Sequence, residues 1–159
     1  LFAGYVVAME SLAWTAAALP ISHLEGRWPA RLIRAGAVCV LVSLAICAAA
    51  FGGGPLAAVL AGGALLGAGF GLSWAFLAQK IITSLPENER AIGAAGITTV
   101  RLTGAATGAA MAAVVANLLG FDQGVTAPVA RAVSVWVFVA AAPLAALGVW
   151  TAWRLTRQA

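Results

Sequence analysis

Two charged residues, Glu10 and Arg101, lie inside long apolar stretches of this sequence and are the leading candidates for chemistry. If each stretch is a helix, Glu10 lies about 18 Å from the polar segment that follows it, and Arg101 lies about 15 Å into its own stretch. Both positions are near the middle of a hydrocarbon core about 30 Å thick. A charge there costs about 2.5–3.5 kcal/mol on insertion scales, so we expect both side chains to face a cavity, water or each other.

Each charge has a polar or aromatic neighbour at helical spacing. Trp14 lies four positions after Glu10, and Thr98 lies three positions before Arg101, so each pair shares one face of a helix. Two interpretations are open. The faces are structural, with a neutral or hydrogen-bonded acid and a paired arginine, or they line a transport pathway in which Glu10 binds and releases a proton. If the two charges come close, Arg101 favours the ionised form of Glu10.

Signatures of catalysis are missing from the sequence. The single histidine, His23, lies in a polar segment between two apolar stretches. The sequence has no metal-ligand cluster, no Gly-x-Ser-x-Gly elbow and no phosphate-binding glycine-rich loop. We therefore expect a protein that is not an enzyme, with no catalytic residues, no metal and no cofactor.

The composition indicates which elements position these residues. The chain has 159 residues, of which 63% are hydrophobic and 9% charged, with a mean hydropathy of +1.00. Soluble domains have about 25% charged residues, and a chain this short cannot bury so many apolar side chains in a globule. The net charge of +4 does not indicate a nucleic-acid partner, because the basic residues flank apolar stretches and form no single patch.

Five stretches are long enough to span a membrane, which takes about 20 residues. Each has to be a helix, because an isolated strand would leave backbone groups unpaired in hydrocarbon. The sequence therefore predicts an all-α membrane protein with about five transmembrane helices in one domain, 1–159. The predicted spans are 2–22, 32–50, 56–79, 91–119 and 129–153.

Lysine and arginine predict the orientation of these helices. Basic residues flank the polar segments 23–31 and 80–90 and follow the last stretch, whereas the other connecting segments contain only Arg131. Because basic residues gather on the cytoplasmic side, the N-terminus is predicted outside and the C-terminus in the cytoplasm. Segment 84–90 also predicts a helix start, because Pro86 and two acids precede a long apolar stretch. Trp74 and Gln79 are interpreted as interface anchors.

Glycines are concentrated in the third and fourth stretches at a spacing of four. Small residues at this spacing share one helix face and let two helix backbones approach closely in lipid. Such a contact is either static or slides during a conformational cycle, and the spacing fits both. The glycines are Gly63, Gly67 and Gly71 in the third stretch and Gly104 and Gly108 in the fourth.

Three segments have the order and spacing of motifs found in one transporter family. In segment 22–31, Leu24, Arg27 and Arg31 match a degenerate Gly-x-Leu-x-Asp-Arg-x-Gly-Arg-Arg loop, although other residues replace its glycines and acid. Segment 65–76 is rich in glycine. Segment 85–104 contains Pro-Glu-x-x-Arg followed by Arg-Leu-Thr-Gly. Together they resemble the C-terminal half of a major facilitator superfamily transporter, and the last resembles the drug–proton antiporter branch, where a Gln usually follows the arginine.

This resemblance implies a six-helix half whose first helix is missing here. The sequence also begins inside an apolar stretch without an initiator Met, so we expect a fragment whose N-terminal half belongs to the same chain. The implied function is proton-coupled efflux of small organic or drug-like molecules across the bacterial inner membrane. The faces around Glu10 and Arg101 would then line the pathway.

Two alternatives to efflux are compatible with the same residues. The first is an importer of nutrients or metabolites from the same superfamily, because nothing in the residues encodes direction. The second is a small structural membrane subunit that packs against a partner and transports nothing. Glu10 separates the second from transport, because a structural bundle has little need of an acid at this depth unless a partner neutralises it.

Overall fold

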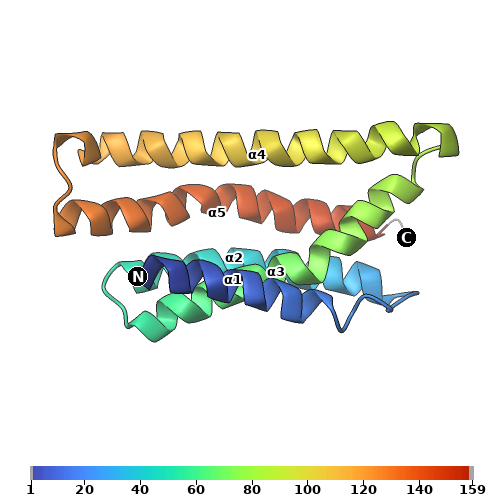
Figure 1. The fold of residues 1–159 in the computed structure, drawn as a ribbon, viewed down its shortest axis with the longest axis horizontal. Helices are drawn as coiled ribbons and strands as arrows, with labels where there is room; N and C mark the ends of the chain where they lie inside the picture. Colours follow the sequence, from blue (N-terminus) through green and yellow to red (C-terminus); the bar gives the residue numbers. More distant parts are fainter. Residues whose placement is uncertain (1, 158–159) are drawn as a thin grey trace.

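The computed structural model describes residues 2–157 of the chain, and their side chains from residue 4 onward. Within this part all regular secondary structure is helical and there is no strand; the chain forms five long helices and two short 3-10 helices (Figure 1). The helices are α1 (Phe2–Ala18), α2 (Trp28–Phe51), α3 (Leu56–Thr83), α4 (Arg90–Leu118) and α5 (Ala127–Arg157); the turns are η1 (Glu87–Glu89) and η2 (Phe121–Gln123).

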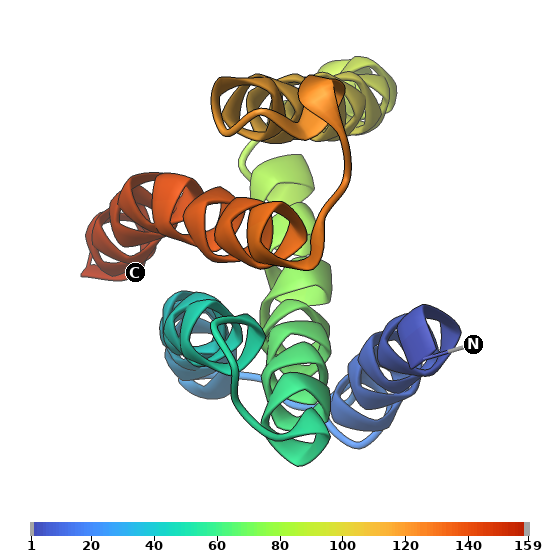
Figure 2. The same ribbon diagram turned by 90° about the vertical axis from the view of Figure 1, so that its left-hand side faces the viewer.

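Helix α3 is the centre of the arrangement. Helices α1 and α2 both pack on α3, and α5 packs on α2 (Figure 2). Helix α4 contacts α5 and α3 more sparsely, and within residues 2–157 it makes no contact with α1. The small core formed by Ile33, Phe76 and Ala152 joins α2, α3 and α5.

Four helices are long and apolar enough to cross a membrane: α2, α3, α4 together with η1, and α5. The prediction of an all-helical chain is confirmed, and four of its helices could span a membrane by their length and composition. Helix α1 has 17 residues and ends at Ala18, four residues before the predicted end of the first span. The reason is Pro20, which has no N–H to continue the helical hydrogen bonds and disfavours a helical conformation of Leu19.

Prolines also set where other helices begin. Helix α2 starts at Trp28, earlier than predicted, because Pro29 fits the first helical turn. The predicted helix start after Ser84 is confirmed: Pro86 precedes η1, and α4 follows at Arg90. Helix α5 continues through Pro143 to Arg157.

The connections alternate between the two ends of the bundle. The α1–α2 and α3–α4 connections lie at the same end as the C-terminal end of α5 (Figure 1). The α2–α3 and α4–α5 connections lie at the other end, together with the start of α1. Because basic residues predict the cytoplasmic end of a membrane bundle, we call the end that holds the α1–α2 connection the basic end.

Candidate functional site

The glycine face predicted on α3 is the face on which α1 rests. Residues four apart on α1 meet glycines four apart on α3, so the two helices run parallel in one register. A Cβ atom added at Gly67 or at Gly71 would collide with a backbone carbonyl oxygen of α1. The backbones therefore approach as closely as small residues allow in lipid. The pairs are Val6 with Gly63, Glu10 with Gly67, and Trp14 with Gly71.

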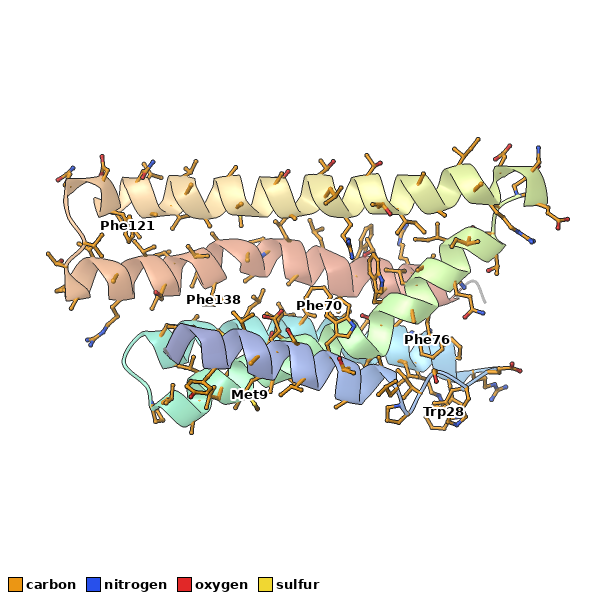
Figure 3. The ribbon with its side chains drawn as sticks, in the orientation of Figure 1. Met9, Trp28, Phe70, Phe76, Phe121 and Phe138 are labelled. Atoms are coloured by element: carbon orange, nitrogen blue, oxygen red, sulfur yellow. The ribbon has the colours of Figure 1, made fainter. Side chains whose placement is uncertain are left out.

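Glu10 is positioned by this contact. Its backbone carbonyl lies against Gly67, while its side chain is half-buried. One turn further along α1, the Trp14 ring stacks on Phe70 of α3, with ring centroids 5.5 Å apart and an angle of 16° between the planes. Phe70 lies where α3 passes α1 (Figure 3). The acid is therefore held at a fixed height on α3 by a glycine contact and by an aromatic stack.

The structure does not bring Arg101 and Glu10 together, because α1 and α4 make no contact within residues 2–157. The guanidinium of Arg101 instead lies 5.9 Å from the ring centroid of Trp74. Both residues line a cleft of about 340 Å³ between α3 and α4. An arginine over a tryptophan ring is stabilised by about 0.5–2 kcal/mol. Trp74, interpreted from the sequence as an interface anchor, thus lines this cleft as the aromatic partner of Arg101.

The remaining residues predicted on α4 are uncovered. Thr98 is exposed, and the nearest acceptor to its hydroxyl is the Ala94 carbonyl of its own helix, at 3.5 Å. Apart from the adjacent backbone of α4 itself, no heavy atom of the described chain lies within 4 Å of a Cβ built on Gly104 or Gly108. The close helix contact predicted at these two glycines therefore does not form here. They line a cleft of about 430 Å³ that reaches Leu144 of α5.

The residues of the loop signature are divided between the core and the surface. Leu24 packs against the core of α2, α3 and α5. Arg27 is the N-cap residue of α2 and is exposed. Arg31 is also exposed, and its guanidinium lies 5.6 Å from the Trp28 ring centroid. Trp28 lies at the basic end (Figure 3).

Sequence reasoning missed one contact, between Arg34 of α2 and Thr156 of α5. Arg34 Nε donates to Thr156 Oγ1 at 2.5 Å, and Nη2 donates to the Thr156 carbonyl at 2.9 Å. The same guanidinium lies 5.9 Å from the Trp153 ring centroid. A cation beside the last carbonyls of a helix is also favoured by the helix dipole. From the sequence, Arg34 was only one of several basic residues that predict orientation, and no local pattern pairs it with α5.

Comparisons of this chain with protein-family models, curated proteins and solved structures find no match. Across residues 2–157, no group of three or more His, Cys, Asp or Glu side chains is placed to hold a metal ion. Two places in the fold hold a charged side chain within an apolar helix. One is the acid on the α1–α3 contact, and the other is the arginine in the α3–α4 cleft.

Proposed function

We propose that this chain is part of a secondary active transporter that exports small organic molecules in exchange for protons. The observation that supports this most directly is Glu10, an acid in the middle of an apolar helix whose backbone is fixed against Gly67. A carboxyl group at that depth is costly when charged, so its protonation is sensitive to what surrounds it. A group of this kind can link proton binding to a change in shape.

The arrangement of α1 and α4 fits a rocking mechanism. Of the five long helices, α1 contacts only α3 within the described residues. None of the residues Arg90–Leu118, all of them described, is buried. Both helices thus present faces that a second set of membrane helices can cover. Secondary transporters rock one such half against the other around a site near the bilayer midplane.

In this proposal the chain is part of the C-terminal half of a major-facilitator-type protein, and α1 spans the membrane in addition to the four longer helices. At about 1.5 Å per residue, α1 is about 26 Å long, close to the hydrocarbon thickness. The N-terminal end of α1 faces outward, and the basic end faces the cytoplasm of a bacterium. Glu10 takes up a proton from outside, which neutralises it, and releases the proton inward as substrate leaves outward. The Arg101–Trp74 pair lines the route on the α4 side.

The test uses the full-length protein in liposomes with an imposed pH gradient. Efflux of a panel of amphipathic fluorescent cations is followed together with the internal pH. Glu10→Gln is expected to abolish the proton flux that accompanies substrate movement, and Glu10→Asp is expected to retain part of it. Glu25→Gln, an acid in the α1–α2 connection, is the matched control and should behave as wild type. Coupling that is unchanged in Glu10→Gln would refute the proposal.

One observation favours a second candidate, a structural membrane subunit without transport activity. The uncovered surface of α4 can bind a separate protein as well as a second half of the same chain. In that case the full-length protein moves none of the substrates in liposomes, and it co-purifies from native membranes with a stable partner. The same liposome measurement therefore separates the two candidates.

A further inference from the structure

A crevice of about 600 Å³ opens between α2, α3 and α5; neither Glu10 nor Arg101 lines it, although Leu77 also lines the Arg101 cleft and Phe70 also stacks on Trp14. Its walls are mostly apolar and include Val40, Phe70 and Leu77. Along the described chain, no Cα atom of α3 lies within 8 Å of one of α5, although Phe76 of α3 and Ala152 of α5 share a small core with Ile33 of α2. The crevice occupies the space that this arrangement leaves open.

The length of the crevice corresponds to one leaflet of a bilayer. On α5 its lining runs from Ala145 to Leu155. Ten helical steps span about 15 Å, which is half of a hydrocarbon core about 30 Å thick. On α2 the lining runs from Ile33 to Val40 at the middle of the helix, and on α3 it lies in the half toward the basic end. The crevice therefore reaches from the basic end of the bundle to about its middle.

The end of the crevice is positively charged. Arg154 lines it and is exposed, and its guanidinium lies 4.7 Å from the ring centroid of Trp150, which also lines it. Within their described ranges, α2, α3 and α5 contain no aspartate or glutamate. Their basic residues toward this end are Arg31, Arg34, Lys80, Arg154 and Arg157.

We propose that this crevice binds an anionic phospholipid, with an acyl chain along the apolar walls and the phosphate at Arg154. A basic residue beside a tryptophan at the membrane surface is a favourable setting for a lipid headgroup, and basic pockets between helices select anionic ones. The three helices that form the crevice carry basic residues and no acid, which matches such a headgroup; the acids Glu25, Glu87 and Glu89 of the connections at this end do not line the crevice. The site is independent of Glu10 and stands whether or not the chain transports.

Gly148 provides a variant that closes the crevice without disturbing the helices. It lines the crevice, and apart from the adjacent backbone of α5 itself no heavy atom of the described chain lies within 4 Å of a Cβ built on it. Gly148→Leu is therefore expected to fill the space that the acyl chain occupies. Gly4→Leu is the matched control, because Gly4 is also helical with free space around its Cβ but lies on α1 at the opposite end. Arg154→Gln removes the headgroup contact, and Arg157→Gln is its control outside the lining.

The experiment measures binding of phosphatidylglycerol and phosphatidylcholine with identical acyl chains to the purified full-length protein by native mass spectrometry. Wild type, Gly4→Leu and Arg157→Gln are expected to prefer phosphatidylglycerol by about fivefold. Arg154→Gln should lose this preference, and Gly148→Leu should bind both lipids several-fold more weakly. Equal binding of the two lipids by wild type would overturn the proposal, as would displacement of the lipid by inorganic phosphate. If Gly148→Leu does not fold, the comparison of Arg154→Gln with wild type is sufficient as a test. An unchanged preference for phosphatidylglycerol in Arg154→Gln would refute the site.

Discussion

The backbone carbonyl of Glu10 in α1 lies directly against Gly67 of α3, with no room for a side-chain atom between the two helices. The height of the one acid inside α1 is thus set by a glycine on another helix. Trp14 and Phe70 repeat the contact one turn further along as a ring stack. A larger residue at Gly67 should therefore displace the backbone of Glu10.

Gly67→Ala is expected to destabilise the protein by about 1–3 kcal/mol, because the added methyl collides with the Glu10 carbonyl and separates the helices. Gly104→Ala is the control: its Cβ meets nothing within 4 Å in the described chain, so the better helix propensity of alanine should leave stability equal or up to about 1 kcal/mol higher. Unfolding of both variants in detergent micelles checks this. Equal stability of the two would contradict the close approach of α1 and α3.

Arg34 and Thr156 should be energetically coupled. Arg34→Met leaves the Thr156 hydroxyl and carbonyl without a charged donor. We expect this to lower the free energy of unfolding by about 1.5–3 kcal/mol. Thr156→Val removes only one of the two acceptors and should cost less. A double-mutant cycle on unfolding free energy should give a coupling of about 0.5–3 kcal/mol. Arg31→Met, at an exposed position, should change stability by no more than about 0.5 kcal/mol. Additive losses at Arg34 and Thr156 would show that the contact does not form.

Arg101 should be coupled to Trp74 and not to Glu10. The guanidinium lies over the Trp74 ring. A double-mutant cycle of Arg101→Met with Trp74→Leu is therefore expected to give a coupling energy of about 0.5–2 kcal/mol. The cycle of Arg101→Met with Glu10→Gln should be additive within about 0.5 kcal/mol, because α1 and α4 do not touch in the described chain. Unfolding in micelles measures both cycles. Strong coupling in the second cycle would show that the two charges pair across the bundle.

A membrane-impermeant reagent should reach the two ends of α4 from opposite sides of the membrane. With Cys39 and Cys47 replaced by alanine, Asn88→Cys in η1 and Gln123→Cys in η2 each carry one exposed thiol. A membrane-impermeant maleimide should label Gln123→Cys in intact cells and Asn88→Cys only after permeabilisation, because basic residues favour the cytoplasmic side. The reverse pattern would invert the proposed orientation. Labelling of both positions from one side would show that α4 does not span.

The helices follow from local features of the sequence. Apolar stretches of this length leave the backbone no other way to satisfy its hydrogen bonds in lipid, so four spans and most helix ends follow from composition and prolines. The glycine face of α3 was also predicted, because a spacing of four places residues on one side of any helix. The predicted end of the first span at residue 22 was wrong. The prediction followed the apolar stretch, whereas Pro20 ends α1 at Ala18.

The neighbour that each helix face contacts depends on the packing of the whole bundle. The spacing that predicts a packing face at Gly67 is the same at Gly104, yet the first lies against α1 and the second against open space. Arg101 meets Trp74, and Arg34 meets Thr156, which lies 122 positions away in the sequence. The physical reason is that local patterns fix how side chains are arranged around one helix. Which helices become neighbours depends on how all of them pack together.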